Sequence, residues 1–134
     1  MLIPHGTIIA LVDGEHLELY RNGGDEAEPE FTALLSPKLD AHNHSGASHH
    51  SSAGNHADGM VIEDAHACAA VAWLNSEVLG HRIEHLVVVA PPRTLGEMRK
   101  HYHKQLEQVL LCELHKDLIG KAPSAILTAL RDKK

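Results

Sequence analysis

The chain has 134 residues, of which 43% are hydrophobic and 22% are charged, and this balance indicates one globular domain over residues 1–134 rather than a disordered or fibrous chain. No stretch approaches the run of about 20 apolar residues that a membrane span requires, and the first residues lack the pattern of a secretory signal. We therefore expect a cytoplasmic protein without a membrane partner. Cys68 and Cys112 lack the spacing of a metal site and are expected to stay reduced.

The net charge of −6 is distributed unevenly along the chain. Residues 1–90 contain three basic and 13 acidic side chains, whereas residues 91–134 contain nine basic and five acidic ones. Only the second part is therefore suited to face a polyanion. The alternative interpretation is a helix face whose basic side chains are simply solvated.

The chain begins with three predicted strands. An apolar run rich in β-branched residues, two alternating stretches and the turn signals between them predict strands at residues 6–12, 15–21 and 29–35. Asp13-Gly14 predicts a two-residue hairpin, and Phe31, Ala33 and Leu35 are expected to share one face. Together these segments predict an antiparallel meander.

Residues 36–60 are predicted to form a flexible loop rich in His, Ser and Gly. Between residues 41 and 57 there are five histidines, no Asp, Glu, Lys or Arg, and no apolar side chain larger than alanine, so the segment cannot bury enough surface to offset its ordering entropy. Long loops inside compact domains are often functional. The loop residues that we expect to contact a ligand are Asp40, His42, Asn43, His44, Ser45, Gly46, His49 and His50.

Three chemistries compete for this loop. Imidazoles ligate Zn, Ni and Cu, but the spacing matches no standard site and no cysteine is near, so we expect adventitious divalent metal at most and no cofactor. Below about pH 6 most of these histidines would be charged, which would make the loop a pH-dependent surface. Serines beside imidazoles suggest a hydrolase, but nothing indicates a rigid nucleophile turn or an oxyanion hole, so we favour a protein that is not an enzyme.

A helix and a central strand are predicted after the loop. Apolar residues cover a broad arc of residues 61–79, with Val61, Ala65, Cys68, Ala72 and Leu79 on one side, widened by Val71, Leu74 and Val78. Gly80 is the expected end of this helix. The β-branched run at residues 85–90 predicts a strand that is covered on both faces.

The segment after this strand offers a candidate anion site. Thr94 and Glu97 have the spacing of a capping box, and a helix N-terminus beyond a strand end would present amides to an anion, with Arg93 beside it. We therefore add Arg93 and Thr94 to the candidate site. The alternative reading of Arg93 is an ordinary surface ion pair. Leu95, Met98, Tyr102, Leu106 and Val109 continue the helical spacing.

The last part of the chain leaves one element open. Residues 109–116 can continue the preceding helix or form a strand, and periodicity does not decide between them. Pro123 then begins a short helix with Ile126, Leu127 and Leu130 inward. The order of elements predicts an α/β fold, with a mixed sheet that begins as the meander and about three helices packed on it.

Three stretches carry a resemblance to a known family. PHGTIIALVDGEHLELYRNGG, DAHNHSGASHHSS and HLVVVAPPRTLGEMRKHYH resemble the bacterial host attachment proteins, described as required for attachment to host cells. That family is distantly similar to the middle domain of eukaryotic and archaeal peptide-chain release factors. In those factors a loop between a strand and a long helix carries Gly-Gly-Gln, which promotes peptidyl-tRNA hydrolysis.

The resemblance implies a five-stranded sheet, with the fifth strand near residues 109–116, and a link to the ribosome or to tRNA. The hydrolytic residues do not carry over, because the chain has no Gly-Gly-Gln and its only glutamines are Gln105 and Gln108. We therefore expect a non-catalytic binding module, with a metal- or pH-responsive adaptor or an ester hydrolase as alternatives. Nothing in the residues themselves encodes adhesion.

Overall fold

The structure, a computed structural model, describes the main chain of residues 2–39 and 55–132 and the side chains of residues 2–39 and 61–132. Its five strands form one mixed sheet in the order β3-β2-β1-β4-β5, which confirms the predicted α/β class. The elements, in chain order, are β1 (Ile8–Val12), β2 (Leu17–Asn22), β3 (Phe31–Leu34), α2 (Asn55–Leu79), β4 (Leu86–Val89), α3 (Pro92–Arg99), α4 (Lys104–Val109), β5 (Leu110–Leu114) and α5 (Pro123–Arg131).

The first three strands form the predicted antiparallel meander, and β4 and β5 add to it in parallel. The strand that only the family resemblance favoured, near residues 109–116, is present as β5. The described part of the chain holds four helices rather than about three, because the helix expected after Pro91 is divided into α3 and α4.

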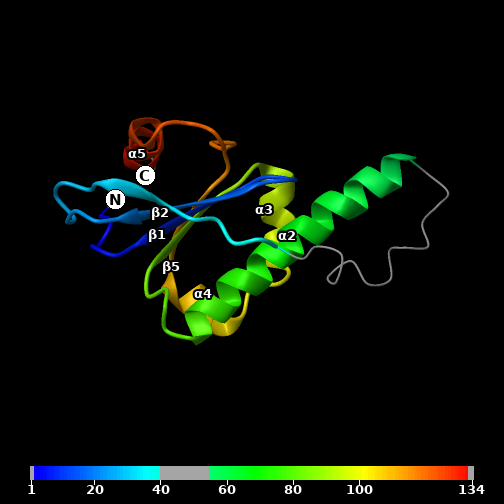
Figure 1. Cartoon of the computed structure of the whole chain (residues 1–134), viewed down its shortest axis with the longest axis horizontal. Coiled ribbons are helices and arrows are strands. Elements are labelled where there is room, and N and C mark those ends of the chain that lie inside the picture. The colour runs from blue at the N-terminus through cyan, green and yellow to red at the C-terminus, as the bar shows by residue number, and fades with distance from the viewer. Residues whose placement is uncertain (1, 40–54, 133–134) are drawn as a thin grey trace.

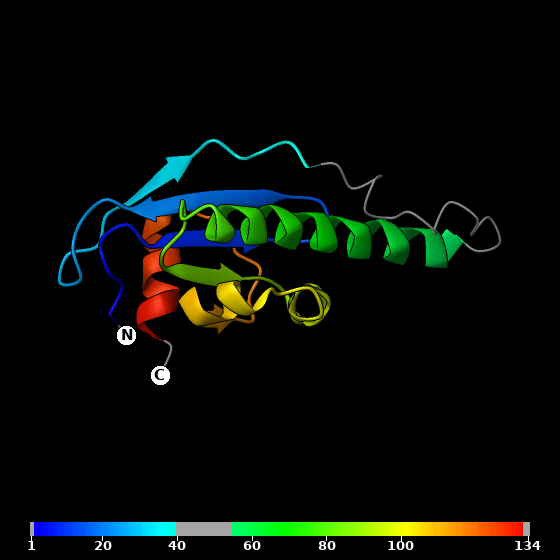
Figure 2. The same cartoon turned by 90° about the horizontal axis from the view of Figure 1, so that it is seen from below.

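Two hydrophobic layers cover the sheet, one on each face. Alternation along β1 sends Ile8, Ala10 and Val12 toward α2, α3 and α4, and sends Ile9 and Leu11 toward α5. Figures 1 and 2 show the three helices on one face of the sheet and α5 on the other. All of β4 is buried, as its continuous β-branched run predicts.

The connection between β1 and β2 differs from the predicted two-residue hairpin. The ladder ends at Val12 opposite Leu17, and the amide of Asp13 donates to the carbonyl of His16 over 3.1 Å, so the loop spans residues 13–16. The Asp13 carboxylate accepts hydrogen bonds from the amides of Glu15 (2.8 Å) and His16 (2.6 Å). Asp13 thus satisfies two amides of this loop through its own side chain.

Helix α2 begins at Asn55 rather than residue 61 and has 25 residues. Figure 2 shows its N-terminal part extending beyond the sheet, as a rod of this length should, at about 1.5 Å per residue. The predicted inward stripe is only partly right, because Leu79 is 49% exposed. From residue 65 to residue 74 every position except His66 is apolar or small, so the pattern of this stretch does not fix which side faces the sheet. The most deeply buried residues of α2 are Ala67, Ala69, Ala70, Val71 and Leu74, of which only Val71 and Leu74 belong to the predicted stripe.

The C-terminus of α2 uses a histidine where glycine is usual. The amide of Arg82 donates to the Glu77 carbonyl (2.8 Å) and the amide of His81 donates to the Val78 carbonyl (3.0 Å), which is the Schellman pattern. Its left-handed position falls on His81, with φ 62°, and not on Gly80, the predicted end.

The division between α3 and α4 has a visible cause on α2. The Asn75 side chain donates to the carbonyl of His101 over 3.0 Å and accepts from the amide of His103 over 3.1 Å. His103 in turn is the N-cap of α4, where its Nδ1 accepts from the amide of Gln105 at 3.0 Å. These bonds satisfy main-chain groups that a continuous helix would have paired. The continuous helix that the spacing from Leu95 to Val109 predicts is therefore wrong.

Helix α5 begins with Pro123, as predicted, and turns Ile126 and Leu130 into the core. Leu127, also expected inward, is half-buried and packs at the edge of that cluster. Among the described helices, none is long and apolar enough to cross a membrane.

Candidate functional site

The carboxyl ends of β1 and β4 lie at one edge of the sheet, because these two strands are parallel neighbours. This edge is where open α/β sheets most often bind ligands. The loop at residues 13–16 follows β1, α3 follows β4, and α2 passes beside both. The His66 ring lies with its Nε2 atom 3.0 Å from the carbonyl of His16, which joins α2 to that loop.

The side chains of Asp13 and His16 form an ion pair at this edge, 3.1 Å apart. Partial burial acts to raise the pKa of Asp13, but the amides of Glu15 and His16 and the imidazole outweigh it and hold that pKa below its usual value. The hydrogen bond and the charge of Asp13 raise the pKa of His16. The exposed imidazole is therefore held in its charged form to a higher pH than a free histidine.

Arg93, a candidate anion ligand, is directed toward carboxylates of α2. Its Nη2 atom donates to both carboxylate oxygens of Asp64, at 3.1 and 3.3 Å, and its Nε lies 3.9 Å from Glu63. All three side chains are substantially exposed. This geometry corresponds to the surface ion pair, and the binding of an anion by Arg93 stays a prediction.

Thr94 does not cap α3. The helix starts earlier, with Pro91 at the N-cap, Pro92 inside the first turn and no side-chain cap bond. The expected capping box of Thr94 and Glu97 is therefore wrong. Proline at the first position has no amide to satisfy, so the chain can enter the helix without a hydroxyl cap. Glu97 instead pairs with His101 (2.9 Å) and Lys100 (3.1 Å).

A polar network around Glu113 is the feature that the sequence did not indicate. Glu113 lies on the edge strand β5, where Arg99 donates to its Oε1 through Nε (3.0 Å) and Nη2 (2.7 Å). The Tyr102 hydroxyl donates to its Oε2 over 2.8 Å, and the Nη2 atom of Arg99 is 3.2 Å from the His115 ring. The network joins β5 to α3 and to the segment after it. Residues from separate segments meet here, so no local spacing could reveal it.

The groups around Glu113 keep its carboxylate in the charged form. Burial acts to raise the pKa of Glu113, but the hydrogen bonds from Arg99 and Tyr102 lower it below its ordinary value. Burial and the nearby carboxylate raise the pKa of Tyr102, so its hydroxyl stays a proton donor. Burial also raises the pKa of the Cys68 thiol, as does the charge of Glu97. A protonated thiol and a fully paired carboxylate are poor nucleophiles.

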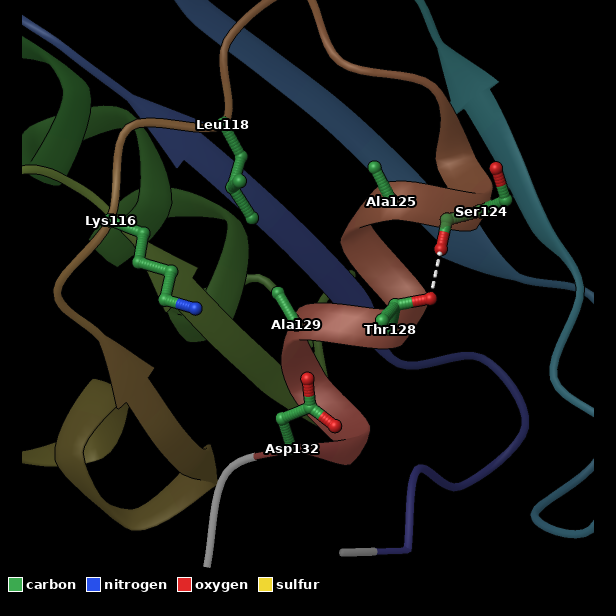
Figure 3. A pocket seen from close by; sticks show the side chains of 7 residues that line it. All are labelled: Lys116, Leu118, Ser124, Ala125, Thr128, Ala129 and Asp132. Atoms are coloured by element: carbon green, nitrogen blue, oxygen red, sulfur yellow. Dashed lines mark hydrogen bonds between the residues drawn. The ribbon is translucent and has the colours of Figure 1, made fainter.

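A surface groove lies between α5 and the segment that follows β5. Its volume is about 410 Å³. Figure 3 shows Lys116 and Leu118 on one wall and α5 on the other, with Ala125 and Ala129 turned toward the groove. The Thr128 hydroxyl donates to the Ser124 carbonyl over 2.9 Å. No carboxylate among the described residues lies within ion-pair distance of Lys116.

The predicted loop ligands lie outside the described residues. They are Asp40, His42, Asn43, His44, Ser45, Gly46, His49 and His50. In residues 2–39 and 61–132, no group of three or more His, Cys, Asp or Glu side chains is arranged to hold a metal ion.

Residues 6–130 match the profile of bacterial archaeo-eukaryotic release factor family 12. The chain belongs to this family. No curated protein matches the sequence. The match confirms the release-factor likeness carried by the three sequence stretches, whereas host attachment stays a prediction. The chain belongs to a release factor family, yet its 134 residues contain no Gly-Gly-Gln.

Proposed function

We propose that this family member is a non-catalytic binding module that contacts ribosomal or transfer RNA through its basic C-terminal part, residues 91–134, called here the second half. The observation that carries the proposal is how the basic side chains are paired. Arg93, Arg99 and Lys100 are engaged by carboxylates. Within the described residues, the other four cations of this half have no carboxylate partner at ion-pair distance, and all four are exposed. They are Lys104, Lys116, Lys121 and Arg131.

Unpaired lysines and arginines are suited to phosphate, because binding releases the counterions condensed on RNA and no internal ion pair has to be broken first. Lys116 lies on the wall of the groove beside α5, where its ammonium group is accessible. The acidic residues 1–90 repel a polyanion, which limits the contact to surface formed by residues 91–132. Family membership supports the choice of ribosomal or transfer RNA among polyanions.

The experiment is co-sedimentation of purified protein with ribosomes at low and high salt. We expect binding at low salt that is lost at high salt. The variant Lys116→Glu/Lys121→Glu should bind much more weakly. Its matched control is Arg21→Glu/Lys38→Glu, which changes the net charge equally in the acidic half and should bind almost as wild type. Absence of co-sedimentation at low salt, or equal loss in both variants, would refute the proposal.

A further inference from the structure

Strand β3 forms one edge of the sheet, with only β2 beside it. Figure 2 shows no described segment on its outer side. Thr32, Ala33 and Leu34 are exposed, and Leu35, which follows the strand, is 97% exposed. An open edge presents unpaired main-chain groups that another strand can use.

Hydrogen-bonded and non-hydrogen-bonded residue pairs alternate along β2 and β3, and this alternation identifies which main-chain groups of β3 point away from the sheet. The amide of Gly23 donates to the carbonyl of Glu30 over 2.8 Å, so this pair is of the hydrogen-bonded type. In the same register, Thr32 opposite Arg21 and Leu34 opposite Leu19 also bond to β2. The N–H and C=O groups of Phe31 and Ala33 therefore point away from the sheet, and no described residue takes them up.

Two prolines bound this outward series. Pro29 and Pro37 occupy the same alternate positions as Phe31, Ala33 and Leu35. Because proline has no amide hydrogen, outward donors are confined to the three residues between them. The three outward amides, those of Phe31, Ala33 and Leu35, are therefore spaced symmetrically about Ala33. No charged residue lies from Phe31 to Leu35, whereas edges that must remain single usually carry lysine or an inward charge.

We propose that this edge binds a second copy of the same chain, antiparallel, with a two-fold axis at Ala33. In this register Ala33 pairs with Ala33 of the other copy, and Phe31 pairs with Leu35 of the other copy. Every outward donor then meets an outward acceptor, and each Pro29 lies opposite a Pro37, where no donor is missed. The two sheets become one continuous sheet.

Side-chain packing supports this register over its neighbours. Phe31 packs on the α5 side of the sheet, and extending the alternation of β3 by one residue past its end at Leu34 puts Leu35 on that same side. Pairing therefore lays the most exposed large apolar side chain of the described residues against the Phe31 ring of the other copy. Aromatic–aliphatic cross-strand pairs of this kind stabilise antiparallel ladders. Because the edge contact is small, we expect micromolar rather than tighter association.

The first test is sedimentation equilibrium of the full chain over a concentration series. Wild type should pass from monomer to dimer. In Ala33→Pro the lost amide is one that points away from β2, so the fold should persist while dimerisation weakens by at least about tenfold. Leu35→Glu introduces a negative charge and removes the apolar contact with Phe31 of the other copy, so it should weaken dimerisation to a similar extent. Ile62→Glu removes another exposed apolar side chain and adds the same charge on α2, and it should dimerise as wild type.

Hydrogen exchange supplies a second readout that is specific to the edge. The amides of Phe31 and Ala33 should become protected as the concentration rises, whereas amide protection in β4 should not change. A monomer at all concentrations would overturn the proposal. So would a dimer that Ala33→Pro and Leu35→Glu leave intact.

Discussion

The side chain of Asn75 accepts a hydrogen bond from the main-chain amide of His103 over 3.1 Å, and its amide group donates to the carbonyl of His101 over 3.0 Å. One side chain on α2 thus fixes both sides of the break between α3 and α4. Asn75→Ala should lower the free energy of unfolding by about 1–2 kcal/mol, because both main-chain groups lose their partner. Urea denaturation measures this loss. Asn75→Asp keeps only the acceptor, so its free energy of unfolding should lie between those of wild type and Asn75→Ala.

His81 holds a left-handed conformation at the end of α2, with φ 62°. His81→Gly should raise the free energy of unfolding by about 0.5 kcal/mol, because glycine adopts this region without a Cβ clash, although its entropy cost in the unfolded chain offsets part of the gain. His81→Ala should give no gain, since the clash remains. If alanine and glycine stabilised equally in urea denaturation, backbone strain would not be the cause.

Glu113 should make stability depend on acid. Its pKa is lowered in the folded state, so its contribution is fully present above its ordinary value near 4.5 and is lost as pH falls through the folded pKa. Glu113→Gln should reduce the free energy of unfolding at neutral pH by about 1–2 kcal/mol and flatten the acid limb of stability against pH. A variant with an unchanged acid limb would show that the network does not contribute.

The raised pKa of His16 can be read directly by an NMR titration of its ring protons. We expect a value above the ordinary 6.5, because Asp13 bonds to the imidazole. The pair is formed below that raised value and is lost as pH rises through it. Asp13→Asn should return the pKa of His16 toward 6.5, whereas Glu18→Gln should change it little. Equal shifts in both variants would mean that general charge, and not the hydrogen bond, is responsible.

Local patterns predicted much of this fold. Leu17 and Leu19 alternate with polar residues because only one face of β2 is buried. The run of β4 is continuously apolar because both of its faces are buried, and either pattern identifies a strand. Pro123 likewise marks the start of α5. Periodicity did not separate strand from helix after residue 108, and the strand β5 was predicted from the family resemblance alone.

What the sequence could not predict depends on contacts between distant segments. The break after Lys100 comes from Asn75, on another helix. Glu113, Arg99 and Tyr102 meet only when the edge strand packs beside α3. The predicted loop ligands, from Asp40 to His50, lie outside the described residues and stay predictions.

The most direct measurement of RNA binding is the salt dependence of tRNA affinity for wild type and for Lys116→Glu/Lys121→Glu. We expect a linear fall of log affinity with log salt concentration, and a slope smaller by about two in the variant, because each lost phosphate contact lowers the slope by roughly one. Arg21→Glu/Lys38→Glu should keep the wild-type slope. A wild-type affinity that does not depend on salt, or no binding to tRNA or ribosomes, would contradict the account.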